Sequence, residues 1–261
     1  MAAEARGGWD PSQYLRFGEH RLRPALELLQ RIAHPGPSLV YDLGCGTGNM
    51  TRISAERWPD AAIVGTDSSP DMLAKAAAEP SRITWEAIDV RTWQAPRPVD
   101  VIFSNAMLQW VTGHRAIFPR LVAQLAPGGV LAVQMPLSWS EASHRLMRQT
   151  LGEMGTEHAA LLRQLELKWV ADAGDYDDLL APLVRDLDIW ETRYYQVLEG
   201  ADPVLEWVKG TGLRPVLDGL KGADLDRFIA TYRQRLSEAY PRRPDGRTVD
   251  PFPRLFIVAR R

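Results

Sequence analysis

The sequence predicts a doubly wound α/β fold with a seven-stranded, mostly parallel sheet and a helical lid insertion. Three observations indicate it: apolar runs alternate with helix-like segments from about residue 38 to residue 136, a glycine-rich turn follows the first run, and the alternation stops after residue 136. Alternating strands and helices are typical of βαβ units and a parallel sheet. Hydrophobic residues make up 45% of the 261 residues, which is enough to bury a large core.

The elements of the first part follow in order. We expect strands over residues 39–43, 62–67, 83–89, 99–105 and 130–135. Helices are expected between them over 49–58, 70–78 and 115–125, where apolar residues recur every three or four positions. Pro127-Gly128-Gly129 is predicted as the turn that ends the third helix.

The part after residue 136 is predicted to be mainly helical. Residues 141–164 and 203–240 indicate helices, and 188–197 and 254–260 indicate the sixth and seventh strands of the same sheet. Residues 241–253, rich in proline and charge, are expected to form an exposed loop. We therefore divide the chain into a cofactor-binding core (1–136) with an N-terminal helical segment, a helical lid (137–187) and a last segment (188–261) that holds two core strands and a helical, substrate-binding stretch.

Composition excludes several classes of function. The net charge of −2 argues against a broad nucleic-acid surface, which usually needs a basic excess. No run of about 18 apolar residues is present to span a membrane, and the N-terminal residues lack the apolar core of a signal peptide. The single cysteine, Cys45, allows no intramolecular disulfide and fits a reducing cytoplasm. No Cys/His cluster has metal-ligand spacing, so we expect no metal.

The glycine-rich turn, Asp42-Leu43-Gly44-Cys45-Gly46-Thr47-Gly48-Asn49, is the strongest indication of a ligand site. Glycines permit positive φ and let the backbone approach a ligand closely. A dinucleotide site usually has the spacing GxGxxG, whereas this turn has GxGxG, which favours a ligand without phosphates. Asp42 could accept from an ammonium group of that ligand or order the loop.

Polar side chains are expected at the ends of the next strands. Asp67 could accept both hydroxyls of a ribose, although it could also cap a helix in place of Ser68-Ser69-Pro70. Asp89 could accept from an adenine amine, and Asn105 ends the fourth strand. Ligands bind at this edge of doubly wound sheets.

These features resemble the class I S-adenosylmethionine-dependent methyltransferases. Further segments are similar to one branch, the trans-aconitate methyltransferase family: Trp9-Asp10-Pro11-Ser12-Gln13-Tyr14-Leu15, Asn105-Ala106-Met107-Leu108-Gln109-Trp110-Val111, Gly129-Val130-Leu131-Ala132-Val133-Gln134-Met135-Pro136, Trp207-Val208-Lys209-Gly210-Thr211-Gly212-Leu213-Arg214-Pro215 and Phe252-Pro253-Arg254-Leu255-Phe256-Ile257-Val258-Ala259-Arg260. Residues 137–144 and 152–175 depart from that family. The resemblance implies S-adenosylmethionine as cofactor, held by Tyr14, Asp42, Gly44, Gly46, Gly48, Asn49, Asp67, Ser68, Met72, Asp89, Val90, Asn105 and Ala106.

The resemblance also implies a small anionic polycarboxylate as acceptor, with trans-aconitate and its monomethyl ester as the expected pair. A carboxylate is already ionised at neutral pH, so methyl transfer to it needs no general base. Arginines suit such an acceptor, because their planar guanidinium groups bind carboxylates through two hydrogen bonds. We expect Arg214, Arg254 and His144 to bind it, although each could instead be a structural residue. Gln109 and Trp110 are the candidates beside the reacting methyl group.

Three other functions stay open at this point. The acceptor could be malonyl-acyl carrier protein, whose methyltransferases resemble this core. The chain could also be a non-catalytic module that binds S-adenosylmethionine. A dehydrogenase is the third, and the GxGxG spacing counts against it. The sequence does not indicate an oligomeric state.

Overall fold

The computed structural model describes residues 18–261, which form two compact units. We call them the sheet unit and the helical unit. The sheet unit consists of Arg21–Pro136, Trp169–Thr192 and Arg254–Arg261. The helical unit consists of residues 18–20, Leu137–Lys168 and Arg193–Pro253.

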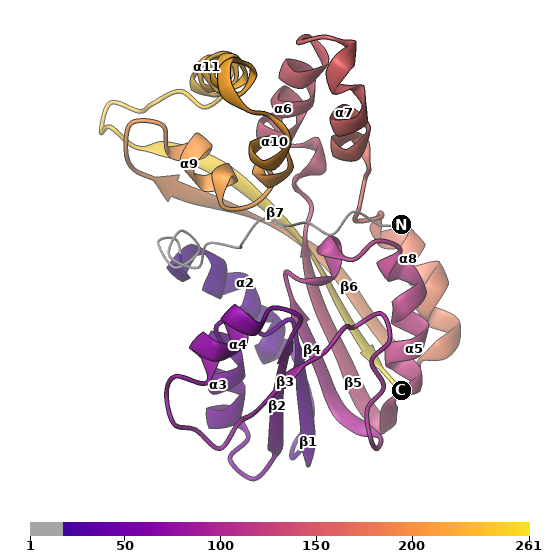
Figure 1. Ribbon diagram of the computed structural model, residues 1–261. Coiled ribbons are helices and arrows are strands. Elements are labelled where there is room, and N and C mark those ends of the chain that lie inside the picture. The colour runs from indigo at the N-terminus through magenta and orange to yellow at the C-terminus, as the bar shows by residue number, and fades with distance from the viewer. Residues whose placement is uncertain (1–17) are drawn as a thin grey trace. The chain divides into compact units, whose positions relative to one another are not determined.

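One seven-stranded sheet runs through the structure in the order β3-β2-β1-β4-β5-β7-β6 (Figure 1). Its strands are β1 Leu39–Leu43, β2 Ala62–Asp67, β3 Thr84–Ala87, β4 Val99–Asn105, β5 Leu125–Pro136, β6 Asp186–Leu198 and β7 Thr248–Arg260. Strands β1 to β5 pair in parallel, and β7 pairs antiparallel with β5. The predicted doubly wound, mostly parallel sheet of seven strands is confirmed.

Both faces of the sheet are covered, which explains why β1 is buried along its whole length. Alternate side chains of β1 point to opposite faces: Asp42 accepts a hydrogen bond from Thr51 of α3, whereas the ring of Tyr41 contacts Trp93. Figure 1 shows α3 and α4 on one side of the sheet and α5 and α8 on the other. The helices of the sheet unit are α2 Gly18–Arg31, which begins just before it, α3 Asn49–Arg57, α4 Pro70–Ala76, α5 Ile117–Ala123 and α8 Ala173–Leu180.

The helical unit is built around the contact between α6 and α11 (Figure 1). Phe228, Tyr232 and Leu236 recur every four residues on α11 and are buried. The Tyr232 hydroxyl donates to the carbonyl of Ser143 near the start of α6, and the Ser143 N–H donates to the Tyr240 hydroxyl. The helices of this unit are α6 Ala142–Gly152, α7 Ala159–Glu166, α9 Pro203–Lys209, α10 Arg214–Gly219 and α11 Gly222–Ala239.

Five short 3-10 helices complete the described part of the chain. They are η1 Leu108–Trp110, η2 His114–Ala116, η3 Ser138–Ser140, η4 Thr156–His158 and η5 Ala181–Leu183.

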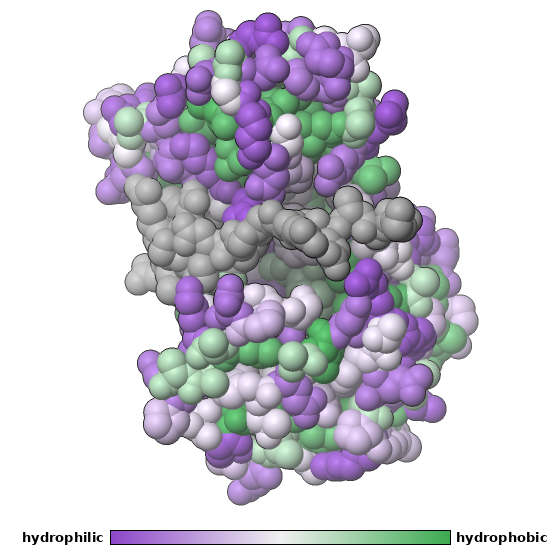
Figure 2. All heavy atoms as spheres, in the orientation of Figure 1, coloured by the Kyte–Doolittle hydropathy of each residue, from purple (hydrophilic) through white to green (hydrophobic). Residues whose placement is uncertain are grey.

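Figure 2 shows, on the face of the helical unit that it presents, hydrophobic residues gathered in a patch with hydrophilic residues around it. Among the described helices, none has the length and apolar character that crossing a membrane requires.

Four expectations about the elements were wrong. Pro127-Gly128-Gly129 does not separate a helix from a strand: α5 ends at Ala123, and the turn forms an irregularity inside β5, with Gly128 at φ 78°. The helix expected over 141–164 is broken after α6, where Gly155 has φ 132°. β3 ends at Ala87, two residues earlier than expected. The expected loop 241–253 is part of β7 from Thr248 onward.

Candidate functional site

The predicted cofactor residues gather at the point where the strand order reverses. The chain builds β1, β2 and β3 in one direction and then returns to place β4 on the other side of β1. Because β1, β2 and β4 are parallel neighbours, their carboxyl ends meet at the same edge of the sheet. Ligands of open α/β sheets bind at such a switch point.

The three glycines of the turn after β1 have different roles. All three have positive φ, at 77°, 57° and 81° for Gly44, Gly46 and Gly48. A Cβ on Gly44 would lie 2.2 Å from Met107 Cγ, and one on Gly48 would lie 2.5 Å from the ring of Trp85, so these two are required by packing. A Cβ on Gly46 would meet no atom within 4 Å. Gly46 is therefore the glycine of the turn whose side-chain position is open for a ligand.

Asp42 is a buried carboxyl beneath this turn, 2% exposed. Its Oδ2 accepts a hydrogen bond of 2.6 Å from the Thr51 hydroxyl. Burial raises the pKa of Asp42 to about 7, with the Thr51 hydrogen bond lowering it and the charge of Asp67 raising it. A nearby cation would lower this pKa, because it stabilises the charged form. Asp42 can thus order the loop and become a counter-ion when an ammonium group binds.

Asp67 ends β2 and orders two backbone segments at once. Its Oδ2 accepts from the N–H of Gly46 at 2.9 Å, and its Oδ1 accepts from the N–H of Ser69 at 2.9 Å. The helix cap is made by Ser69, whose hydroxyl accepts from Met72 N–H, and not by Ser68, which is exposed. A carboxylate has about four acceptor positions. Asp67 therefore keeps acceptor capacity for the hydroxyl groups of a ligand.

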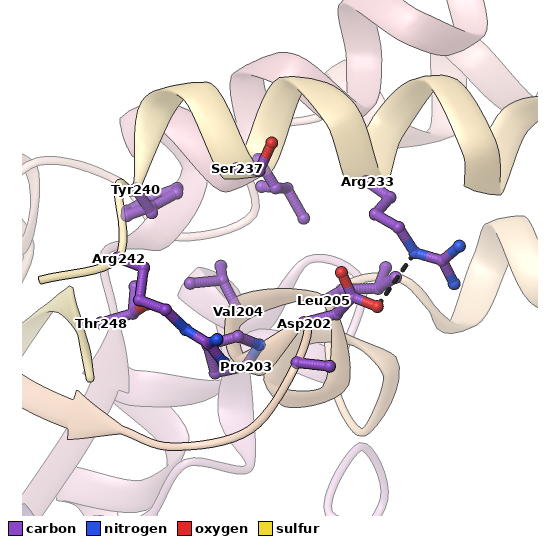
Figure 3. A pocket seen from close by; sticks show the side chains of 11 residues that line it. Asp202, Pro203, Val204, Leu205, Arg233, Ser237, Tyr240, Arg242 and Thr248 are labelled. Carbon is purple, nitrogen blue, oxygen red and sulfur yellow. Dashed lines mark ion pairs between the residues drawn. The ribbon is translucent and has the colours of Figure 1, made fainter. Parts of the chain in front are cut away.

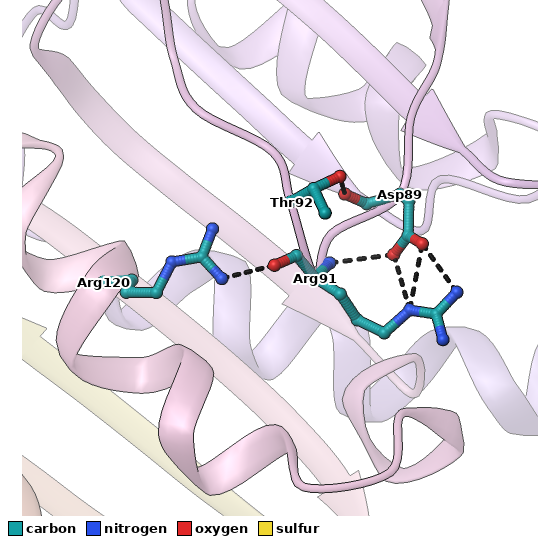
Figure 4. A network of polar contacts seen from close by, with 4 residues as sticks. All are labelled: Asp89, Arg91, Thr92 and Arg120. Atoms are coloured by element: carbon teal, nitrogen blue, oxygen red, sulfur yellow. Dashed lines mark hydrogen bonds and ion pairs between the residues drawn. The ribbon is translucent and has the colours of Figure 1, made fainter.

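Asp89 lies in a turn two residues beyond the end of β3, and its carbonyl accepts from the N–H groups of Thr92 and Trp93. Figure 4 shows its carboxylate paired with Arg91, whose Nη2 lies 2.6 Å from Oδ2. These hydrogen bonds hold the pKa of Asp89 below its ordinary value. Arg120 donates to the carbonyl of Arg91 and fixes the same turn. Asp89 is thus ionised and oriented, and Val90 beside it is buried.

The end of β4 presents buried amide groups. Ala106 has the unusual φ of 54°, and its N–H donates to the carbonyl of Gln134 on β5. Gln109 Nε2 donates to the Ala106 carbonyl at 2.6 Å. The buried Oδ1 of Asn105 and Oε1 of Gln109 have no hydrogen-bond partner among the described residues. Trp110, in contrast, is 50% exposed.

Two residues of this region were not predicted as site residues. Gln134 is 1% exposed on β5, and its Nε2 has no hydrogen-bond partner among residues 18–261. The buried hydroxyl of Thr47, inside the glycine turn, also has no hydrogen-bond partner in the described part of the chain. The position of Thr47 in the turn could have indicated it from sequence. Gln134 becomes visible only through the strand register that pairs it with Asn105.

Arg254 was expected at the beginning of the last strand, and this is wrong. β7 begins at Thr248, so Arg254 lies in mid-strand, where it pairs with Pro136 of β5 and is 7% exposed. Residues alternate between the faces of a strand. Arg254 therefore lies on the same face as Phe256, the register partner of Gln134.

The other predicted acceptor residues, His144 and Arg214, belong to the helical unit. A Cβ on Gly212 would lie 2.5 Å from His144 Nε2, so this glycine lets the loop before α10 approach the imidazole. Arg214 is the first residue of α10 and is half-buried. Burial, followed by the charge of Arg148, lowers the pKa of His144 to about 4. The imidazole is therefore neutral at neutral pH, and its Nδ1 lies 3.2 Å from the Ser143 hydroxyl.

Tyr14, the remaining predicted residue, lies outside the described residues. Asn49, at the beginning of α3, is exposed, whereas Met72 on α4 is buried. Figure 3 shows a small pocket of the helical unit between α9 and α11, where Arg233 pairs with Asp202 at 3.0 Å. No predicted site residue lines this pocket. Within residues 18–261 no group of His, Cys, Asp or Glu side chains could hold a metal ion.

The residues at the switch point fit S-adenosylmethionine. The open position at Gly46 permits close approach of a ligand to the backbone. Asp42 is placed to become a counter-ion for an amino group, and Asp67 retains acceptor capacity for ribose hydroxyls. The Oδ1 of Asn105, which has no hydrogen-bond partner among residues 18–261, has the capacity to accept from a donor on a ligand.

Comparisons with known proteins agree with this geometry. A family model described as "Methyltransferase domain" matches residues 40–129. A protein of Azoarcus sp. (strain BH72) named trans-aconitate 2-methyltransferase is 46% identical over 96% of this chain and 98% of its own length. One of the same name from Streptomyces avermitilis is 49% identical over 96% of each chain.

Solved structures show the same fold at low identity. The YcgJ protein of Bacillus subtilis has a TM-score of 0.58 and 11% identity over 93% of this chain and 98% of its own. Phosphoethanolamine N-methyltransferase 2 of Haemonchus contortus, solved in complex with S-adenosyl-L-methionine, has a TM-score of 0.52 and 17% identity over 91% of this chain and 52% of its own.

Fold, switch-point site and relatives together define the class: the protein is an S-adenosylmethionine-dependent methyltransferase with a Rossmann-like α/β fold. With relatives 46–49% identical over almost its full length, the chain belongs to the trans-aconitate 2-methyltransferase family.

Proposed function

We propose that the enzyme methylates a carboxylate oxygen of trans-aconitate and releases the monomethyl ester. The observation that carries this proposal is the similarity to relatives of that name, which extends over 96–97% of the chain and therefore beyond the residues matched by the methyltransferase domain model. In a fold that serves many acceptors, the segments outside the cofactor-binding core are the ones expected to distinguish them.

The cofactor supplies a methyl group on a sulfonium, so a new O–CH₃ bond forms while the S–CH₃ bond breaks and its electron pair stays on sulfur. No proton moves, because a carboxylate acceptor is ionised at neutral pH. The protein is left with binding, alignment and exclusion of water. His114, which follows β4 in the sequence, is buried against the Tyr176 hydroxyl at 2.7 Å, and burial lowers its pKa. This hydrogen bond gives His114 a structural role, in agreement with a reaction that needs no base.

The residues of the sheet unit divide this task. Gly46, Asp67 and Asn105 are proposed to hold the cofactor, together with Asp42 below the turn. Gln109, fixed by its hydrogen bond to the Ala106 carbonyl, is proposed to orient the acceptor carboxylate with the second N–H of its Nε2. Trp110 is half exposed, and a shielding role there requires that the acceptor cover its indole.

Arg214 and Arg254 are proposed to neutralise the acceptor. An acceptor with three carboxylates loses several kcal/mol on desolvation unless positive groups pair with it. His144 adds a hydrogen bond but no charge, because its pKa of about 4 keeps the ring neutral. Arg214, two residues after the glycine that contacts His144, is the proposed source of positive charge for the acceptor from the helical unit.

The test measures transfer of labelled methyl groups from S-adenosylmethionine to trans-aconitate, cis-aconitate, citrate, isocitrate and malonyl-acyl carrier protein. We expect trans-aconitate to have the highest kcat/KM. Arg214→Gln should raise its KM at least ~10-fold, equivalent to about 1.4 kcal/mol, and leave cofactor affinity unchanged. Arg233→Gln is the matched control, because this arginine of the same unit is paired with Asp202.

The results separate the parts of the proposal. A protein that binds the cofactor and labels none of the acids refutes the proposed acceptor. Preferred labelling of the carrier protein assigns a different carboxylate. An unchanged KM in Arg214→Gln, or an equal rise in Arg233→Gln, removes Arg214 from the acceptor site.

A further inference from the structure

Three neighbouring strands place polar side chains on one face of the sheet unit. The register pairs Asn105 of β4 with Gln134 of β5, and Gln134 with Phe256 of β7. Two residues further along the ladder, Pro136 pairs with Arg254. Since side chains two residues apart on a strand share a face, Asn105, Gln134 and Arg254 all lie on the same face. Gln134 has Asn105 as its direct neighbour and Arg254 as its diagonal neighbour.

The residues proposed to bind the cofactor lie on this same face. Asp42 pairs with Phe103 in the ladder between β1 and β4, and Phe103 is two residues before Asn105. Asp42, Asn105 and Gln134 consequently share a face, and the hydrogen bond from Thr51 identifies it as the face covered by α3. Gln134 lies at the carboxyl end of β5, beside the switch point.

The amide of Gln134 is unusual because it is buried and incompletely paired. Its side chain is 1% exposed, and Nε2 has no hydrogen-bond partner within the described residues. Natural proteins pair most buried polar atoms, because an unpaired donor loses its hydration without replacement. Asn105 Oδ1 is also unpaired, although the two residues are register partners and their groups are complementary. Each of these two amides therefore has one polar atom without a hydrogen-bond partner among the described residues.

The hydrogen-bonding character of the Gln134 amide indicates which ligand group it binds. The Nε2 of Gln134 is a hydrogen-bond donor, the positively charged Arg254 occupies the diagonal position on β7, and a carboxylate oxygen is a matching acceptor for such a donor. The sulfonium and ammonium groups of the cofactor are cations and do not match this donor. A carboxylate is present both in the amino-acid part of the cofactor and in the acceptor of the proposed reaction. Gln134 lies on β5, whereas the glycine turn and Asp67, proposed to hold the cofactor, lie at the ends of β1 and β2, and this position favours the acceptor.

We infer that Gln134 is a substrate-binding residue that donates its Nε2–H to a carboxylate oxygen of the acceptor and selects for that group. The inference rests on the proposed function. Gln134 adds direction without charge, so it fixes one oxygen while the carboxylate keeps its negative charge and its nucleophilicity. Removal of the amide weakens acceptor binding and leaves the cofactor in place.

The test is equilibrium binding of trans-aconitate to the full chain saturated with S-adenosylhomocysteine, measured by titration calorimetry. Gln134→Leu keeps the volume and removes the donor, and Gln134→Glu keeps the shape but presents a negative charge. We expect the Kd for trans-aconitate to rise at least ~10-fold in Gln134→Leu and further in Gln134→Glu. The Kd for S-adenosylhomocysteine and the melting temperature should stay at the wild-type values in Gln134→Leu.

Gln196→Leu is the matched control, because Gln196 is a buried glutamine of β6 in the helical unit whose amide atoms also lack hydrogen-bond partners within residues 18–261. It should leave both Kd values unchanged. An unchanged Kd for trans-aconitate in Gln134→Leu overturns the inference alone, as does an equal loss of S-adenosylhomocysteine affinity or an equal effect of Gln196→Leu. If the wild-type protein binds S-adenosylhomocysteine but no trans-aconitate, the proposed function fails and the inference fails with it.

Discussion

Replacing Asp42 with asparagine tests whether the carboxyl below the glycine turn is protonated in the free protein. Burial raises the pKa of Asp42 from 3.8 to about 7, against the lowering effect of the Thr51 hydrogen bond. Because the folded-state pKa lies above the unfolded one, the stabilising contribution of this group is complete below about pH 4 and is lost as pH rises through 7. Between pH 5 and pH 8 the loss is about 3 kcal/mol, since each pKa unit corresponds to 1.36 kcal/mol.

The assay is urea denaturation of the wild-type protein and Asp42→Asn, without cofactor, at several pH values from 5 to 8. The wild-type free energy of unfolding should fall by about 3 kcal/mol more than that of the variant over this range. Thr51→Val is an internal control, because it keeps the carboxyl but removes the hydrogen bond that lowers its pKa. Its pH dependence should extend to higher pH. Parallel curves for wild type and Asp42→Asn would refute the argument that burial keeps Asp42 protonated.

Four further variants test the switch-point site by calorimetry with S-adenosylmethionine and by thermal melting. Gly46→Ala should weaken cofactor binding at least ~10-fold and lower the free energy of unfolding by about 1 kcal/mol. Gly48→Ala should lower the free energy of unfolding by at least about 2 kcal/mol, because its Cβ meets a tryptophan ring. Equal stability losses in the two variants would contradict this distinction. Asp67→Asn should weaken cofactor binding about 10-fold, and unchanged affinity would leave it only its role in ordering the loop. Asp89→Asn should weaken cofactor binding about 5-fold. It should shift the melting temperature by less than about 1 °C, because the ion pair of Asp89 with Arg91 is exposed. A large shift would show that this ion pair stabilises the fold.

The sequence predicts the strands next to the switch point closely and the later ones less well. β1, β2 and β4 have the expected bounds, since continuous apolar runs end there at glycine, aspartate or asparagine. The expected last strand begins at residue 254, later than β7, because the proline and charge of residues 241–253 predict an exposed loop. The structure accommodates Pro251 and Pro253 before the ladder with β5, which begins at Arg254. Tertiary pairing thus decides a boundary that local composition cannot.

The residues of the candidate site also differ in how far local sequence predicts them. The glycine turn and Asp67 are within about 25 residues of each other along the chain, and their spacing is enough to predict them together. Gln134 and Arg254 come together only because β7 inserts antiparallel beside β5. No local pattern marks a glutamine in an apolar strand as different from a solvent-facing one. Its burial is a consequence of register.

The order of side chains across the sheet unit suits a reaction between a cation and an anion. The acidic residues Asp42 and Asp67 belong to β1 and β2, and Arg254 belongs to β7, with the neutral amides of Asn105 and Gln134 on the strands between. With strands roughly 4.8 Å apart, Arg254 is too far from the two acidic residues to pair with them. In the proposed transfer a sulfonium and a carboxylate become two neutral groups, so charge disappears along the reaction. Strongly polar surroundings stabilise such reactants more than the transition state. Buried neutral amides in the middle of the edge orient the reacting groups without that penalty, whereas a charged residue at either position would hold one reactant and repel the other.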